Sequence, residues 1–170
     1  MLKVGSTVFY PLHGTGIIES IEHLDYIGIK DINRECFKIF FFKKNLHIFV
    51  PVKTESGLRS MCTIRELEQA ELEFFNPAKL LPNIDQERII LLDKKIRSGN
   101  VSEFSQILRD ILNYHARKGR LSGTDRKIFK IAEQFLIEEI QFVKKISYDQ
   151  AKSLVQLSVK KRFETTSDTL

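Results

Sequence analysis

The sequence predicts an α+β protein, in which a small β-sheet of about five strands is followed by a compact domain made only of helices. Up to residue 62, short runs of β-branched and aromatic residues are separated by glycine, proline and polar residues. Beyond it, apolar residues recur at intervals of three and four, the spacing of an α-helix with one buried face. The chain has 170 residues, 42% of them hydrophobic and 29% charged, which is a globular composition and enough length for one domain or two small ones.

Five segments of the first part have the composition of short strands. Pro11 and Pro51 each end a run, since proline cannot donate a hydrogen bond to a neighbouring strand. Gly14 and Gly16 bracket a tight turn, and the polar residues 43–45 form a hairpin loop. The pattern indicates a small twisted sheet or an open barrel. The strands are predicted at residues 7–10, 16–21, 35–42, 46–50 and 57–61.

Three consecutive phenylalanines, Phe40, Phe41 and Phe42, end the third predicted strand. Successive side chains of a strand point to opposite faces, so the three rings cannot all enter one core. Either the sheet is covered on both faces, by the helix of residues 63–75 or by a partner, or one or two of these rings are exposed.

Five helices are predicted after residue 62, because capping residues stand at the ends of each periodic segment. Thr63 and Glu66 form a capping box, and Gly99 and Gly119 are placed to take the left-handed conformation that ends a helix. Ser122 is predicted to cap the fourth helix. The first four helices cover residues 63–74, 85–96, 101–118 and 123–145, and the fifth begins at Ser147, with Ala151, Leu154, Val155 and Leu157 facing inward.

These elements divide the chain into four parts. A barrel is expected over residues 1–62, a helix and linker over 63–83, and a helical domain over 84–160. The tail, residues 161–170, is expected to fray because it is polar and terminal.

Positive charge is concentrated in the second part of the chain. The formal net charge is +5, yet residues 1–75 carry nine basic and ten acidic side chains, whereas residues 76–170 carry 18 basic and 12 acidic ones. This distribution predicts that the helical part binds a polyanion and that the first part binds a different kind of partner.

One group of basic residues in the helical part surrounds a predicted turn, and another, Lys94, Lys95 and Arg97, lies near Gly99. The first group flanks the helix start at Ser122: Arg117, Lys118 and Arg120 before it, and Arg126 and Lys127 after it. Backbone amides at a helix start, next to such side chains, would bind phosphate groups without reading a base sequence. The alternative interpretation is a solvated basic face.

The sequence contains no motif of an active site or a metal centre. The Gly14–Gly16 turn lacks the third glycine of a dinucleotide-binding loop, and the four histidines and two cysteines lack metal-ligand spacing. We therefore expect no enzyme activity, no cofactor, no metal and no small-molecule substrate. Since no apolar run reaches the length of a membrane span and no export signal is visible, we expect a cytoplasmic protein without a membrane partner.

Four segments together resemble the CarD family of bacterial transcription regulators. Residues 4–16, Val-Gly-Ser-Thr-Val-Phe-Tyr-Pro-Leu-His-Gly-Thr-Gly, resemble the signature Val-Gly-Asp-x-Val-Val-Tyr-Pro-x-His-Gly-x-Gly, which also occurs in the RNA-polymerase-interacting domain of transcription-repair coupling factor. Residues 97–101, 107–111 and 121–127 resemble the family's Ser-Gly-Asp-Val turn, Val-Val-Arg-Asp-Leu helix and Leu-Ser-x-x-Glu-Lys-Arg helix start. The resemblance covers about residues 3–157 and includes no helicase motif, which indicates a stand-alone regulator.

The resemblance implies a Tudor-like N-terminal barrel that docks on the β subunit of bacterial RNA polymerase. It also implies a helical domain that contacts promoter DNA at the upstream edge of the melted bubble and stabilises the open complex, in some members with an aromatic wedge in the minor groove. The implied polymerase contacts, on a strand edge, are His23, Leu24, His47, Phe49 and Val50. The implied DNA contacts are Ile84, Arg88, Lys118, Arg120, Arg126 and Lys127.

The chain departs from the family pattern at both surfaces. It has no tryptophan, so Ile84 is the smaller apolar residue at the wedge position, while Leu24 and Phe49 stand where the family often has arginine. The missing tryptophan keeps open a polymerase adaptor that does not bind DNA. A second alternative is an RNA- or ribosome-binding module, since small barrels with a glycine turn also occur in that class. An unrecognised hydrolase is the weakest alternative, because no nucleophile–base pair is visible.

Overall fold

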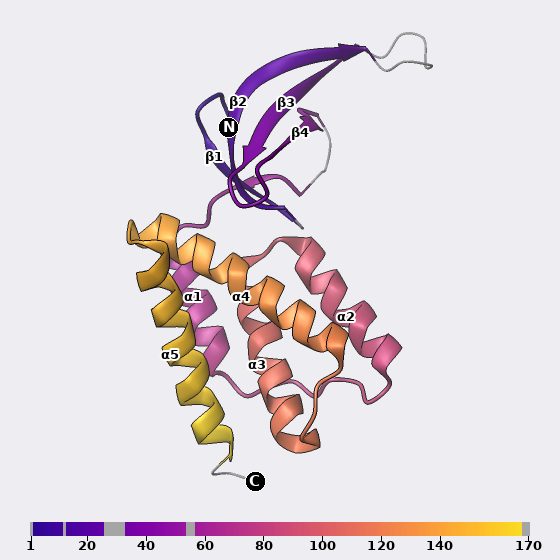
Figure 1. Ribbon diagram of the computed structural model, residues 1–170, viewed down its shortest axis with the longest axis vertical. Helices are drawn as coiled ribbons and strands as arrows, with labels where there is room; N and C mark the ends of the chain where they lie inside the picture. The colour runs from indigo at the N-terminus through magenta and orange to yellow at the C-terminus, as the bar shows by residue number, and fades with distance from the viewer. Residues whose placement is uncertain (1, 12, 26–32, 54–56, 168–170) are drawn as a thin grey trace. The chain divides into compact units, whose positions relative to one another are not determined.

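The computed structural model describes residues 2–11, 13–25, 33–53 and 57–167. The chain folds into two compact units, Met1–Met61 and Cys62–Leu170, of which the first is a β-sheet and the second is helical (Figure 1). The α+β fold class predicted from the sequence is therefore confirmed.

The sheet unit contains five antiparallel strands in the order β4-β3-β2-β1-β5, so β4 and β5 are its outer strands. Figure 1 labels β1 to β4. β2 is longer than the predicted strand, because a bulge between Ile18 and Ser20 interrupts the alternation and pairing with β3 then resumes as far as Asp25. The strands are β1 (Thr7–Tyr10), β2 (Gly14–Asp25), β3 (Asn33–Phe41), β4 (Leu46–Pro51) and β5 (Arg59–Ser60).

The main apolar cluster of the sheet unit lies on one face, while Phe9 and Cys36, which alternate with its members, are also buried. Phe41 is fully buried, whereas the neighbouring Phe42 is 53% exposed, so the three phenylalanines do divide between faces. Gly16 is needed where β2 and β3 meet, because a Cβ atom there would lie 2.7 Å from the carbonyl oxygen of Phe40. The buried cluster consists of Val8, Ile18, Phe37, Ile39, Phe41 and Val50.

The helical unit is organised around α3, which contacts each of the other four helices, with α2 and α5 on opposite sides of it (Figure 1). The capping box of Thr63 and Glu66 and the left-handed Gly99 and Gly119 are present as predicted. Within the described residues, no helix is both long and apolar enough to cross a bilayer. The helices are α1 (Ile64–Phe75), α2 (Asp85–Ser98), α3 (Val101–Lys118), α4 (Gly123–Lys144) and α5 (Tyr148–Ser167).

α5 differs from its prediction in two respects. Ala151 and Val155 are buried as expected, but Leu154 is 42% exposed and Leu157 is 65% exposed, because only one side of α5 packs on α3 and α4. The helix also continues to Ser167, through residues expected to fray. Its last turns are held by Arg162, whose guanidinium donates hydrogen bonds to the carbonyl oxygens of Phe74 and Asn76.

A buried ion pair fastens the connection between α1 and α2 to the rest of the helical unit. Arg109 and Asp110, in one of the segments that resemble the CarD family, are neighbours on α3, and both are at least 98% buried. Asp110 accepts a hydrogen bond from the backbone amide of Lys79 (2.9 Å), and Arg109 donates one to the carbonyl oxygen of Glu73 (3.0 Å). This Arg-Asp pair therefore fixes backbone rather than forming an exposed surface.

Candidate nucleic-acid interface

A hollow of about 660 Å³ on the helical unit is formed where the start of α2, the end of α3 and the start of α4 meet. We call it the basic hollow, because four of its lining side chains are basic: Arg88, Lys118, Arg120 and Arg126. All four belong to the six DNA-contact residues that the family resemblance implies. Ile84 lies between two further lining residues, Asn83 and Asp85, while Lys127 is exposed on α4 outside the lining.

The turn between α3 and α4 brings these basic side chains together. Gly119 ends α3 in the left-handed conformation, with a φ of 71°, and Ser122 caps α4 only three residues later. Lys118 and Arg120 therefore project from one side of the turn, and Arg126 from the first turn of the next helix. The sequence signals for this geometry are local, which is why the cluster could be predicted.

Arg88 does not have the role that the resemblance implies. Its side chain is only 1% exposed, and Nε and Nη2 donate parallel hydrogen bonds to the carboxylate of Asp125, at 3.0 and 2.9 Å. Nη2 also donates to Asp85 at 2.7 Å. Because its donors are bound to protein acceptors, Arg88 is a structural ion pair between α2 and α4 and not a contact for a DNA phosphate.

The same guanidinium holds the backbone that precedes α2. Arg88 Nη1 donates hydrogen bonds to the carbonyl oxygens of Pro82 (2.9 Å) and Asn83 (3.3 Å). Its planar group also lies 4.4 Å from the centre of the Tyr114 ring of α3. The next residue, Ile84, is 61% exposed, so an apolar side chain is held in water beside the basic hollow. Tyr114 and Asp125 are members of this site that sequence reasoning missed; the only signal for Asp125 was its place in a capping box.

The charge of the basic hollow comes from its exposed residues. Burial alone would raise the pKa of Asp125, but hydrogen bonds from Arg88 and Ser122 outweigh it and hold that pKa below its ordinary value. The hydrogen bond with Asp125 in turn raises the pKa of Arg88. Both groups are therefore charged at neutral pH and compensate each other. Lys118, Arg120 and Arg126 remain to attract an anion, and the exposed carboxylate of Asp85, which also lines the hollow, offsets part of their charge.

Ser122 and Gly123, at the N-terminus of α4, line the same hollow. The backbone amide of Asp125, the third residue of the helix, donates a hydrogen bond to the hydroxyl of Ser122 at 3.0 Å and so has an acceptor. The amides of Gly123 and Thr124 precede it and have no acceptor inside the helix, as is general for a first turn. These amides and the three exposed cations suit the phosphates of a nucleic-acid backbone.

The candidate polymerase contacts do not form one cluster. His47 and Phe49 share the outer face of the outer strand β4, and Phe49 is 41% exposed. His23 lies on β2 opposite Glu35 of β3, whereas His47 lies opposite Phe40. These two positions on β3 are five residues, or about 17 Å, apart.

Two of the implied polymerase contacts, Val50 and Leu24, cannot be assigned to an exposed surface. Val50 is 1% exposed and belongs to the core of the sheet unit, because it follows Phe49 and points to the opposite face. Its side chain is therefore unavailable to a partner. The side chain of Leu24 lies outside the described residues.

Comparison with known proteins accounts for both units. Residues 2–62 match the family model of the CarD-like/TRCF RID domain, in which RID denotes an RNA-polymerase-interacting domain, and residues 77–156 match that of the CarD C-terminal domain. The chain is also similar to the Bacillus subtilis (strain 168) protein named "Putative transcription factor YdeB". The two are 28% identical over 157 residues, which is 90% of this chain and 99% of that protein.

Proposed function

Because this chain belongs to the CarD family of transcription regulators and its first unit is an RNA-polymerase-interacting domain, we propose that it joins RNA polymerase to promoter DNA and changes the stability of the open complex. In this proposal the sheet unit binds the β subunit of the polymerase, and the helical unit binds DNA.

The observation that carries the DNA part of the proposal is the basic hollow. Lys118, Arg120 and Arg126 are exposed there beside the amides of the α4 start, and the remaining arginine is compensated by Asp125. Such contacts position a phosphate backbone without reading bases, so binding would be weakly sequence-specific and strongly dependent on salt. Ile84 would present a small apolar group to the minor groove next to these contacts.

The DNA part is tested by the binding of the full chain to a forked promoter duplex at about 50 and 200 mM salt. The variant Arg120→Gln/Arg126→Gln removes two phosphate contacts. It is expected to lower the affinity at least about tenfold and to reduce the slope of log affinity against log salt by about two.

The matched control is Arg65→Gln/Lys152→Gln, which removes two exposed cations from α1 and α5, outside the basic hollow. The slope of log affinity against log salt is expected to differ from the wild-type slope by no more than about 0.5, because these residues lie outside the basic hollow. Equal losses in the two double variants would contradict the assignment of the hollow. A wild-type chain that binds no duplex at either salt concentration would instead favour a polymerase adaptor that does not bind DNA.

The polymerase part of the proposal rests on the outer strand β4. One edge of β4 pairs with β3, and the other edge has no neighbouring strand within the described sheet. Such an edge can add to a sheet of another protein by main-chain hydrogen bonds. Phe49 would supply side-chain contacts, together with the neighbouring rings of Phe40 and His47, whose centres are 5.0 Å apart. With both units bound, the lifetime of the open complex would change on addition of the protein.

A further inference from the structure

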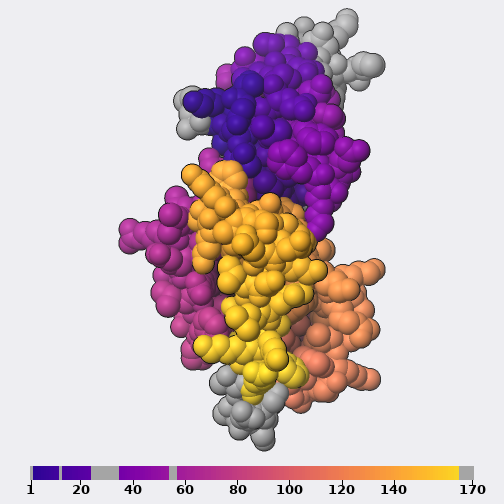
Figure 2. Space-filling model, turned by 60° about the vertical axis from the view of Figure 1, so that its left-hand side comes forward, coloured from indigo at the N-terminus to yellow at the C-terminus, as the bar shows by residue number. Residues whose placement is uncertain are grey.

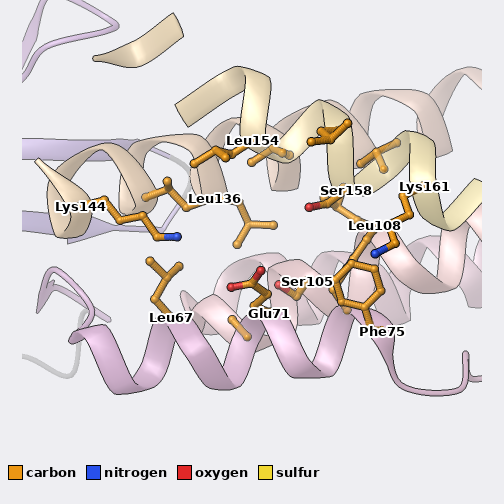
Figure 3. A pocket seen from close by; sticks show the side chains of 16 residues that line it. Leu67, Glu71, Phe75, Ser105, Leu108, Leu136, Lys144, Leu154, Ser158 and Lys161 are labelled. Atoms are coloured by element: carbon orange, nitrogen blue, oxygen red, sulfur yellow. The ribbon is translucent and has the colours of Figure 1, made fainter. Parts of the chain in front are cut away.

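Helices α1 and α5 border an apolar groove of about 330 Å³ on the helical unit. Its floor is formed by the buried Leu108 of α3 and Leu136 of α4, and its walls include Phe75 of α1 and Leu154 of α5 (Figure 3). Leu157 of α5 also lines the groove. The space-filling view shows α1, in magenta, beside α5, in yellow, on one face of this unit (Figure 2). We call this feature the α1–α5 groove; it is separate from the basic hollow.

The groove exists because α5 has apolar residues on two sides. Ala151 and Val155 pack against the bundle, whereas Leu154 and Leu157 turn toward the groove and are 42% and 65% exposed. Phe75, on the opposite wall, is also exposed. Burial of such neighbouring apolar side chains by a partner removes them from water, which favours binding.

Three charged side chains border the groove in a fixed order. Lys144 lies with Leu67 at one end, Glu71 points into the middle from α1, and Lys161 lies with Phe75 at the other end (Figure 3). The ammonium of Lys161 is 5.8 Å from the centre of the Phe75 ring. Leu67 and Phe75 are eight residues apart on α1, so the groove extends about 12 Å, or two helical turns.

We propose that the α1–α5 groove binds an amphipathic helix of a partner protein, and this proposal does not depend on the function proposed above. Apolar side chains at positions i, i+4 and i+7 of that helix would fill two turns of groove, the usual geometry of helix-in-groove recognition. Two acidic side chains about seven residues apart would meet Lys144 and Lys161, and a basic one on the other flank would meet Glu71. A purely anionic amphiphile fits less well, since Glu71 would repel it in the same groove.

The proposal is tested with a synthetic alanine-based helical peptide that carries this pattern: three leucines as the stripe, two glutamates on one flank and a lysine on the other. Binding of the fluorescent peptide to the full chain is measured by anisotropy. Binding is expected to be saturable, and a peptide with its charges reversed is expected to bind about tenfold more weakly, since three favourable pairs become unfavourable.

A pair of protein variants locates the site. Leu157→Gln removes part of the apolar wall of the groove and is expected to lower the affinity for the peptide about five- to tenfold. The matched control is Ile90→Gln on α2, because Ile90 is 63% exposed, like Leu157, but lies outside the groove. Both positions are exposed, so both variants are expected to fold.

Specific outcomes would overturn the proposal. One is the absence of saturable binding by the designed peptide, and another is equal affinity for the charge-reversed peptide. Equal weakening by Leu157→Gln and Ile90→Gln would place the peptide elsewhere. Self-association of the chain alone in sedimentation, abolished by Leu157→Gln, would show that a second copy occupies the groove instead.

Discussion

At the scale of single residues, Arg88 links three helices through one guanidinium group. It binds Asp125 at the start of α4, Asp85 at the start of α2 and the Tyr114 hydroxyl on α3, which lies 3.2 Å from Nη1. A buried ion pair adds little net stability compared with apolar packing, but the loss of one partner leaves the other charge buried and unpaired. The role of the pair is therefore measured by the loss of unfolding free energy when one partner is removed.

The variant Arg88→Met is expected to lower the free energy of unfolding by about 3–5 kcal/mol, because it leaves the Asp125 carboxylate buried without its cation. Urea denaturation followed by circular dichroism measures the change. The control is Arg97→Met, which removes an arginine from the exposed pair with Asp93 and is expected to cost less than about 1 kcal/mol. Similar losses in the two variants would contradict a buried role for Arg88.

The cost of Arg88→Met should also depend on pH with a definite sign. In the wild type the pKa of Asp125 lies below its ordinary value, so its stabilisation is complete above about pH 3.9 and is lost as the pH falls through the lowered pKa. Without Arg88, only the hydrogen bonds from Ser122 oppose the effect of burial, so the pKa of Asp125 is expected to rise, and protonation then relieves the buried charge. The difference in unfolding free energy between variant and wild type is therefore expected to shrink as the pH is lowered from 7 toward 4; a constant difference would contradict it.

At the scale of elements, the turn between α3 and α4 sets the position of the exposed cations of the basic hollow. Gly119 has a φ of 71° and no atom within 4 Å of where its Cβ would lie, so a side chain there meets a backbone preference and not a steric clash. Gly123, at the first position of α4, is equally open but has ordinary helical geometry.

This pair of glycines permits a matched test of the turn. Gly119→Ala is expected to destabilise the helical unit by about 1–2 kcal/mol, the cost of the left-handed conformation for a residue with a Cβ. Gly123→Ala is expected to be neutral or to stabilise the unit by up to about 1 kcal/mol, since alanine is the better helix former. The midpoints of urea denaturation compare the two, and a destabilisation by Gly123→Ala as large as that by Gly119→Ala would contradict the role given to the turn.

How much of each element could be predicted depends on how local its cause is. The helix boundaries at Thr63, Gly99 and Gly119 follow from residues within one turn, and they were predicted correctly. The last turns of α5 were missed because Arg162 binds the carbonyl oxygen of Asn76, 86 residues earlier in the chain.

The same distinction applies to the candidate site. The cluster of Lys118, Arg120 and Arg126 follows from one short turn and was predicted. The burial of Arg88 was not, because its partner Asp125 is 37 residues away and an arginine in a sequence carries no sign of whether it is paired. The core position of Val50 was missed although the alternation of β4 contained the signal.

At the scale of the whole molecule, the two units expose surfaces of different chemistry. The sheet unit presents exposed aromatic side chains on and beside its outer strand β4, whereas the helical unit presents a basic hollow and a separate apolar groove. If each unit serves its own partner, the two functions should be separable by substitutions in the full chain.

Phe49→Asp is expected to weaken binding to the polymerase β subunit about tenfold or more, because it places a charge where an apolar ring would be buried. Affinity for the forked duplex is expected to remain within about twofold of the wild-type value. Surface-immobilised β subunit and filter binding measure the two affinities.

The matched control for this substitution is Val4→Asp. Val4 is 50% exposed and precedes β1, which is separated from β4 by β2 and β3 in the sheet. It is expected to retain polymerase affinity. Unchanged binding by Phe49→Asp, or the same loss in both variants, would remove β4 from the polymerase interface.

The open edge of β4 has a consequence for the purified protein in isolation. A strand with an unpaired side is a template for pairing between identical molecules and hence for aggregation. Here the strand follows Lys43 and Lys44 and ends at Pro51, which has no amide to donate. Flanking positive charge and a terminal proline are protections that natural sheets use at such margins, so the edge can stay uncovered for a partner without inviting fibril-like stacking of copies.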